Sequence, residues 1–91
     1  MLYINIPKYN FWNVKRIRHE RIIKKLGIKI RQLRVEKELS QLDLSAKSDI
    51  TLNQIGRIER GEINPTISTL HSLALAFGIS VSELLLDVEQ E

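Results

Sequence analysis

Apolar residues recur at helical spacing along most of the chain, which predicts an all-α fold with no interior strand. The first helix is expected over residues 22–37, where four apolar positions follow one face: Ile22, Leu26, Ile30 and Leu33. Gly27 lies in the middle of this helix, where a glycine costs about 1 kcal/mol relative to alanine. We therefore expect a close contact with another helix at Gly27.

Residues 40–61 predict two short helices joined by a tight turn. Ser40 is a good N-cap, because its hydroxyl can accept a hydrogen bond from the amide three residues further on. Asp49 tolerates the left-handed backbone conformation that a tight turn needs, and Thr51 is a second N-cap. The second helix is expected to bury two residues on one side, Ile55 and Ile58.

Two further helices are predicted after a turn at residues 64–65. Thr66 is a suitable N-cap, and Gly78 is the left-handed residue that commonly ends a helix. Ser80 and Glu83 have the spacing of a capping box at the start of a short last helix. The apolar residues expected to be buried are Ile67, Leu70, Leu73, Ala74 and Phe77 in the longer helix, and Val81, Leu84 and Leu85 in the last one.

Charge is distributed unevenly along the 91 residues. Residues 1–60 hold all fourteen lysines and arginines against six acidic residues, a net charge of +8. Residues 61–91 hold five acidic residues and no lysine or arginine, a net charge of −5. The first part is therefore suited to a polyanionic partner, while the second part is available for a different contact.

The length allows one small domain with a modest core. The chain has no cysteine, so disulfides and thiolate metal sites are excluded. No apolar run approaches the roughly 20 residues needed to span a bilayer, and the N-terminus does not have the pattern of a secretory signal. A soluble, cytoplasmic protein without a membrane partner is expected.

The second short helix carries polar side chains on the side opposite its buried isoleucines. Asn and Gln can bond an adenine edge bidentately, Arg a guanine edge, and Leu can touch a thymine methyl group. Such side chains occupy the first turns after Thr51, at Leu52, Asn53, Gln54 and Arg57. The early positions of the second helix in a helix-turn-helix reach the major groove of DNA. The alternative is an ordinary solvated surface.

A longer set of residues extends this pattern: Ser40-Gln41, Leu44, Ile50-Thr51, Ile55, Arg57-Ile58-Glu59-Arg60-Gly61, Asn64-Pro65, Leu70, Ala74 and Gly78-Ile79-Ser80. Together they resemble the lambda-repressor-like helix-turn-helix family, also called the xenobiotic-response-element family, over residues 26–85 without gaps. The resemblance implies a five-helix DNA-binding domain with residues 51–60 in the major groove. It further implies a sequence-specific transcriptional regulator, a repressor or autoregulator that binds a palindromic operator as a homodimer.

The resemblance also implies roles for individual residues. The base-reading set is Thr51, Leu52, Asn53, Gln54 and Arg57, and the set that contacts DNA phosphates is Ser40, Gln41, Arg60, Asn64, Lys24 and Lys25. An ion pair between Arg34 and Glu59 would join the first helix to the end of the reading helix. The sequence departs from the family at Leu52, which can offer only methyl contact, and at Gly56, which softens the reading helix.

The chain is expected to divide into an N-terminal extension (residues 1–23), the helix-turn-helix domain (24–86) and an acidic tail (87–91). In the extension, Leu2, Ile4 and Ile6 alternate with other residues up to Pro7, and a basic helical segment follows from Val14. This extension has three possible roles: an arm along the DNA backbone, a strand that pairs with a second subunit, or a disordered tail.

Apolar residues near the acidic end indicate the dimer interface, namely Leu75, Leu86 and Val88. An antitoxin or another protein-interaction module that acts through a toxin or other protein partner is the alternative function. No enzyme is expected, because His19 and His71 lack neighbouring residues at catalytic or metal-ligand spacing. We expect no cofactor and no metal.

Overall fold

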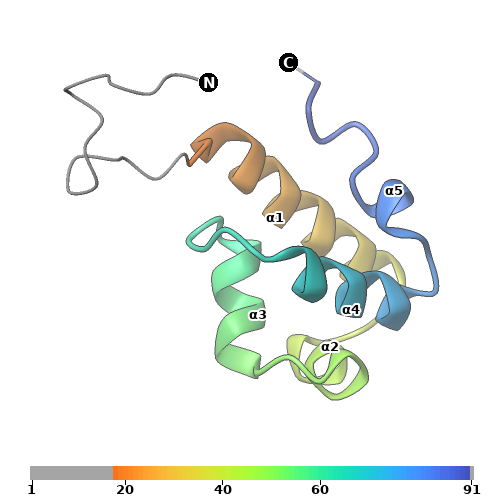
Figure 1. Cartoon of the computed structure of the whole chain (residues 1–91). Helices are drawn as coiled ribbons and strands as arrows, with labels where there is room; N and C mark the ends of the chain where they lie inside the picture. The colour runs from red at the N-terminus through yellow and green to blue at the C-terminus, as the bar shows by residue number, and fades with distance from the viewer. Residues whose placement is uncertain (1–17, 91) are drawn as a thin grey trace, which may run out of the picture.

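The computed structural model describes residues 18–90, and these form five helices without a strand (Figure 1). The helices are α1 (Glu20–Glu36), α2 (Gln41–Ser48), α3 (Leu52–Glu59), α4 (Ile67–Phe77) and α5 (Val81–Leu84). The predicted all-α, five-helix fold is confirmed for this part of the chain. Within it, no helix is both long enough and apolar enough to cross a membrane.

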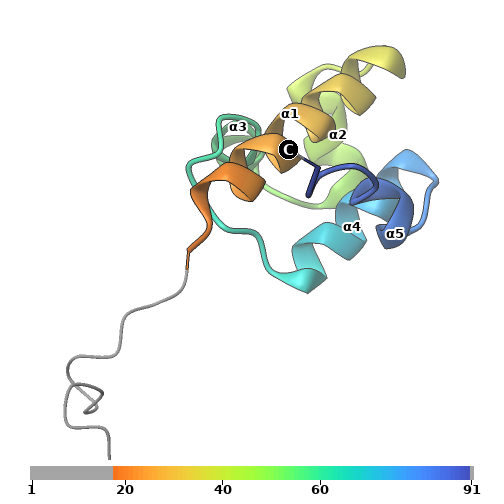
Figure 2. The same ribbon diagram turned by 90° about the horizontal axis from the view of Figure 1, so that it is seen from above.

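The packing of the helices leaves one side of α3 open. Helix α3 packs against both α1 and α2, while α4 packs against α2 and contacts α5. Helix α4 lies between α3 and α5 in Figure 1 and again in the view from above in Figure 2. The outer side of α3 and the surface of α5 are therefore separated, so each can serve a different contact.

The predicted N-caps of α2, α3, α4 and α5 are confirmed, whereas α1 begins two residues before the predicted start at residue 22. Each N-cap side chain accepts a hydrogen bond from the backbone N–H three residues further on, at Ser40, Thr51, Thr66 and Ser80. The turn between α2 and α3 has Asp49 in the left-handed region with φ of 62°, and α4 ends at Gly78 with φ of 73°. These local signals place α2, α3 and α4 almost residue by residue.

A single apolar core joins all five helices, with members Leu26, Ile30, Leu44, Ile50, Ile55, Ile58, Leu70, Leu73, Ala74, Phe77, Leu84 and Val88. The close contact expected at Gly27 is confirmed. A Cβ atom there would lie 2.4 Å from the carbonyl oxygen of Ile58 and 2.7 Å from that of Glu59. The backbones of α1 and α3 therefore touch at Gly27, and only a glycine leaves room for this approach.

The domain boundary expected between residues 23 and 24 lies inside a helix of the structure. Helix α1 begins at Glu20, and Ile23 is only 5% exposed, so the boundary would fall within the helix and cut off a buried residue. The part of the extension that was predicted as a strand or arm lies in residues 1–17, outside the described residues.

The expectation that Val88 lies in a dimer interface is wrong. Val88 is only 4% exposed and belongs to the core. Asp87 has a left-handed φ of 66°, which turns the chain after α5 and returns Val88 to the domain. Lys29 holds this segment, because its Nζ atom donates to the carbonyl oxygens of Leu86 at 2.8 Å and Glu83 at 3.3 Å.

Two apolar residues expected in the core lie at the surface instead. Ile67, in the first turn of α4, is 67% exposed, and Leu85, after α5, is 36% exposed. Helical spacing predicts which side of a helix is apolar, but it does not predict which residues along that side are covered by other parts of the fold. At Ile67 the core has already ended, and near the C-terminus Val88 is buried in the core whereas Leu85 is not.

Candidate nucleic-acid interface

Helix α3 separates its residues into a buried side and an exposed side. Ile55 and Ile58 are 0% and 1% exposed, which anchors the helix on the core. On the other side, Leu52, Asn53 and Arg57 are exposed, with Leu52 at 47%. The structure therefore presents most of the predicted base-reading set together on the open face of α3.

The start of α3 contributes the remaining two members of that set. Thr51 is exposed, and its Oγ1 atom accepts a hydrogen bond from the backbone N–H of Gln54 at 3.2 Å. Gln54 itself is half-buried. Thr51 thus fixes the first turn, and the exposed side chains that follow it are held on a rigid helix rather than on a loop.

The predicted ion pair between Arg34 and Glu59 is present and bidentate. Arg34 donates from Nε to Glu59 Oε2 at 2.6 Å and from Nη2 to Oε1 at 2.9 Å, and from Nη1 to the carbonyl oxygen of Leu39 at 3.0 Å. The amide of Gln41 donates to the same Glu59 Oε1 at 3.0 Å. These three side chains, here called the Arg34–Glu59–Gln41 network, join α1, α2 and α3.

The Arg34–Glu59–Gln41 network fixes the charge states of its members. Burial acts to raise the pKa of the Glu59 carboxyl and is the largest single influence. Hydrogen bonds from Arg34 and Gln41, with the charges of Arg34 and Arg31, together outweigh burial, so the pKa of Glu59 is lowered. The hydrogen bond to Glu59 raises the pKa of Arg34. Both groups therefore remain charged at neutral pH.

Gln41 has one amide hydrogen left over for a second acceptor. A side-chain amide NH₂ group has two donors, and Glu59 takes one of them. Gln41 is the first residue of α2, where the positive end of the helix favours an anion. The preceding Ser40 uses its Oγ as an acceptor for the amide of Asp43 at 2.9 Å, which leaves its hydroxyl hydrogen free to donate.

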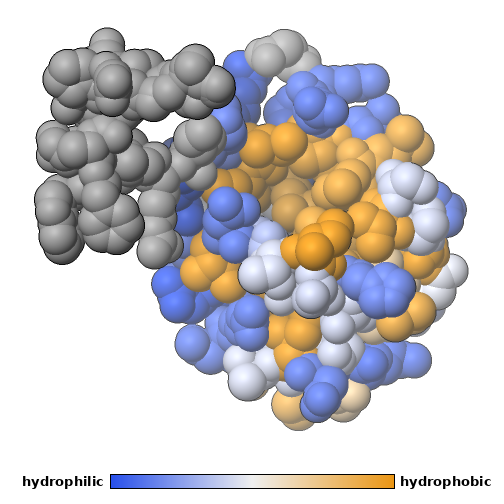
Figure 3. Space-filling view, viewed as in Figure 1, coloured by the Kyte–Doolittle hydropathy of each residue, from blue (hydrophilic) through white to orange (hydrophobic). Residues whose placement is uncertain are grey.

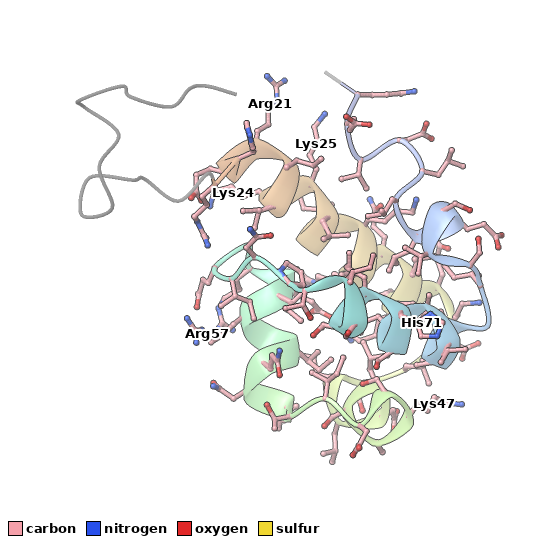
Figure 4. The ribbon with its side chains drawn as sticks, in the orientation of Figure 1. Arg21, Lys24, Lys25, Lys47, Arg57 and His71 are labelled. Atoms are coloured by element: carbon pink, nitrogen blue, oxygen red, sulfur yellow. The ribbon has the colours of Figure 1, made fainter. Side chains whose placement is uncertain are left out.

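The other predicted phosphate contacts come from α1 and from the segment after α3. Arg60 and Asn64 are exposed after α3, and Lys24 lies against Gly61, where a Cβ atom would come within 2.8 Å of the Lys24 Cγ. Lys24 and Arg57 extend toward the same side of the molecule in Figure 4, whereas Lys25 points elsewhere. Lys25 lines a hollow with Val88, so the structure does not bring it together with the other phosphate candidates.

Two residues near α3 were missed by the sequence analysis. Arg31 lines a hollow with Arg34, Gln41, Glu59 and Arg60, and its position three residues before Arg34 on α1 is the signal that would have found it. Glu62, in the loop after α3, pairs with Arg60 at 2.6 Å and with Arg57 at 3.5 Å. No sequence signal marks Glu62, because the turn that brings it beside Arg57 is a feature of the backbone.

No group of three or more His, Cys, Asp or Glu side chains in residues 18–90 is arranged to hold a metal ion. His71 is exposed on α4, far from α3 in Figure 4. The open face of α3 carries hydrogen-bonding and cationic side chains, with Thr51, Asn53 and Arg57 exposed, and such groups can bind the edges and backbone of a nucleic acid.

Comparison with known proteins identifies the family. A family model described as helix-turn-helix matches residues 30–84, more than half of the chain. The chain belongs to this helix-turn-helix family. The lambda-repressor-like resemblance over residues 26–85 is thereby confirmed, and the domain is a DNA-binding module of the kind found in transcriptional regulators.

Members of the helix-turn-helix family with similar sequences are regulators by name. The chain is 40% identical over 65 residues to the HTH-type transcriptional regulator DdrOP3 of Deinococcus deserti, covering 71% of this chain and 50% of that protein. It is 35% identical over 68 residues to the control protein C.MunI of a Mycoplasma species, covering 74% of this chain and 92% of that protein. The chain thus spans half the length of DdrOP3 but nearly all of C.MunI.

A solved structure of the family shares the fold. The restriction-modification controller protein C.Esp1396I, as a tetramer in complex with its natural 35-base-pair operator, matches with a TM-score of 0.69 and 29% identity. The match covers 77% of this chain and 96% of that chain. A helix-turn-helix protein of similar extent therefore binds operator DNA.

Proposed function

We propose that the protein is a sequence-specific DNA-binding transcriptional regulator that inserts α3 into the major groove. The observation that carries this proposal is the exposed side of α3, where Asn53 and Arg57 stand on a helix anchored by buried isoleucines. Asn can read adenine and Arg can read guanine by paired hydrogen bonds. Ser40, Gln41, Lys24, Arg60 and Asn64 flank this helix as phosphate contacts.

The protein acts as a homodimer on a palindromic operator, as a repressor or an autoregulator. One short helix reads only a few base pairs, and two-fold symmetry with half-sites about 34–36 Å apart is the usual way to gain specificity. Exposed Leu75 and Leu86, which are 66% and 61% exposed, support a self-contact on the side away from α3. The proposal involves binding without catalysis, in the cytoplasm.

An alternative function has one specific observation in its favour. Leu52 is 47% exposed on the reading side of α3, and Leu42 on α2 is 65% exposed. A helix-turn-helix domain that had exchanged DNA for a protein partner, such as a toxin, would present apolar residues in these places. DNA binding remains the better proposal, because Arg57 and Asn53 share the face with Leu52.

The first test is binding of the full chain to DNA. A duplex is selected from a randomised library with the wild-type protein, and its affinity is measured by fluorescence anisotropy against salt concentration beside that of a mixed-sequence duplex. We expect the logarithm of affinity to fall linearly with the logarithm of salt, with a slope of about −0.9 per phosphate contacted. Enrichment of no duplex, with no binding at low salt, would favour the protein-partner function.

Two substitutions then separate base reading from backbone contact. Arg57→Ala is expected to cost about 1–3 kcal/mol on the selected duplex and to relax the preference at one base pair. Gln41→Ala is expected to weaken all duplexes by similar factors, because its contact is to phosphate. An Arg57→Ala variant that kept the wild-type base preference would contradict the assignment of Arg57.

A further inference from the structure

The inference concerns Glu62, an acidic residue in the middle of a face that is otherwise suited to DNA. Its carboxylate touches two arginines that the proposed function uses. Arg60 approaches with Nε at 2.6 Å from Oε2 and Nη2 at 3.4 Å from Oε1, while the Nε of Arg57 lies 3.5 Å from Oε1. All three side chains are about half exposed. A carboxylate at this place opposes phosphate binding, so its presence needs a reason.

Backbone hydrogen bonds at the C-terminal end of α3 hold Glu62 beside Arg57. Gly61 has φ of 72°, its N–H donates to the carbonyl oxygen of Ile58 at 3.0 Å, and the N–H of Glu62 donates to that of Arg57 at 2.9 Å. These two bonds are the pattern of a Schellman motif, which reverses the chain after a helix. On its other side, the carbonyl oxygen of Glu62 accepts from Arg18 Nη2 at 3.0 Å.

The atoms in contact decide what Glu62 can do to Arg57. The carboxylate faces the Nε atom of Arg57. Paired hydrogen bonds to the O6 and N7 atoms of guanine need two N–H groups of the guanidinium, and the two Nη atoms can supply them while Nε stays against a carboxylate. Arg57 can therefore read a guanine without leaving Glu62, and Glu62 limits the directions in which the guanidinium points.

Arg60 completes the arrangement from the other side. Its two-point contact fixes the carboxylate of Glu62, and the hydrogen bond from Arg60 is the main reason that the pKa of Glu62 is lowered. The carboxylate is therefore charged at neutral pH. On a duplex without a guanine at the position read by Arg57, the side chains of Arg57 and Glu62 would both face the DNA backbone. The negative charge of Glu62 would then repel the phosphates and weaken binding.

We propose that Glu62 is a positioning residue for specificity, which aims Arg57 at a guanine edge and disfavours duplexes that lack this guanine. This inference rests on the proposed function and on the reading role of Arg57. It assigns to the loop after α3 a part in choosing the operator, although the loop carries no base-reading group itself.

The experiment is a double-mutant cycle between Glu62→Gln and Arg57→Ala on duplexes with single base-pair changes. In the wild type, replacing the base pair read by Arg57 is expected to weaken binding about 5- to 150-fold. In Glu62→Gln this factor is expected to shrink about 1.5- to fivefold, as for a lost exposed charge contact, while the factors at other base pairs stay unchanged. In the Arg57→Ala background, Glu62→Gln should leave every factor unchanged.

Two matched variants separate position from charge. Glu89→Gln removes the same charge from an exposed residue of the C-terminal segment, and we expect it to leave all discrimination factors unaltered. Glu62→Asp keeps the charge but draws the carboxylate back by one methylene group, so it should lose part of the discrimination. Thermal unfolding of each variant checks that it is folded at the binding temperature.

Other outcomes overturn the inference. If Glu62→Gln changed the affinity of all duplexes by one common factor, Glu62 would act only through net charge. If its effect persisted with Arg57→Ala, Glu62 would not act through Arg57. If Arg57→Ala alone altered no base preference, the base-reading role of Arg57 in the proposed function would fail as well, which distinguishes that failure from a failure of Glu62 alone.

Discussion

The residue with the greatest structural consequence is Glu59, whose carboxylate accepts hydrogen bonds from helices on both sides. Its side chain is only 4% exposed and that of Arg34 only 12%. Removing one partner of such a pair leaves the other charge buried without compensation, which usually costs more than the pair contributes as a whole. The Arg34–Glu59–Gln41 network therefore helps to hold α1, α2 and α3 in their relative positions, and the loss of one member is expected to destabilise the fold.

The lowered pKa of Glu59 predicts a dependence of stability on acid. A carboxyl whose pKa is lowered by folding stabilises the native state above its unfolded pKa of about 4.3, and this contribution is lost as the pH falls through the folded-state value. Glu59→Gln is expected to lower the free energy of unfolding by about 2–3 kcal/mol at pH 7 and by much less near pH 3. Urea unfolding at both pH values measures this.

The difference between wild type and variant isolates Glu59 from the other carboxyls. Asp43, Glu62 and Glu83 also have lowered pKa values, so the stability of Glu59→Gln still declines in acid. Glu36→Gln changes an exposed residue of α1 and is expected to stay within about 0.5 kcal/mol of the wild type at both pH values. Equal losses for Glu59→Gln at pH 7 and pH 3 would contradict the assigned charge state.

At the scale of the elements, two glycines in helices have opposite reasons to be there. Gly27 lies where α1 touches the backbone of α3, so added atoms meet carbonyl groups that cannot turn aside. At Gly56 a Cβ atom would lie 3.0 Å from Nη1 of Arg60, the mobile end of an exposed side chain. The first glycine is required by packing, while the second only weakens its helix.

Alanine substitutions are expected to separate these two cases. Gly27→Ala should lower the free energy of unfolding by about 1–3 kcal/mol, because overpacking exceeds the gain in helix propensity. Gly56→Ala should raise it by about 0.5–1 kcal/mol, because alanine is the better helix former and Arg60 can move. Chemical denaturation measures the free energy of unfolding of both variants. Stabilisation by Gly27→Ala would show that α1 and α3 are not in backbone contact.

At the scale of the whole molecule, charge and apolar surface are divided between two ends. The space-filling view in Figure 3 shows apolar side chains gathered between α1 and the C-terminal segment, with hydrophilic side chains around them and a mixed surface over α4. Ile67, Leu75 and Leu86 are the large apolar residues most exposed in this part of the chain. Residues 61–91 themselves carry no lysine or arginine, although Lys25 and Lys29 of α1 lie beside the last of them.

The proposed homodimer predicts different results at two nearby positions. Leu86→Glu should place like charges across a symmetric contact and dissociate the dimer at micromolar concentration, without loss of stability in the monomer. Val88→Ala should lower the free energy of unfolding by about 1–2 kcal/mol, because Val88 is buried in the core. It should leave the dimer interface unchanged. Sedimentation velocity and thermal unfolding distinguish them. A Leu86→Glu protein that still sedimented as a dimer would place the interface elsewhere.

Local signals account for most of what the sequence predicts well. The caps at Ser40, Thr51 and Thr66 and the left-handed residue Asp49 depend on neighbours within a few positions, so their types suffice to place them. Even the Gly27 contact follows from the cost of a glycine in a helix.

The errors concern properties that depend on the whole fold. Val88 returns to the core only because of the turn at Asp87 and the Lys29 hydrogen bonds. Lys25 differs from Lys24 by about 100° around α1, enough to carry it away from the reading helix. Glu62 meets Arg57 through the Schellman motif, which the order of residue types does not reveal.

The separation of roles within α3 has a consequence for how such a protein can change over generations. Its stability rests on Ile55, Ile58 and Glu59, which face inward, whereas Asn53 and Arg57 touch nothing that the core requires. Surface substitutions away from packing and capping usually alter stability by less than about 0.5 kcal/mol. Duplicated genes can therefore acquire new operators through a few outward substitutions on one unchanged scaffold, and related regulators can coexist in one cell without reading each other's sites.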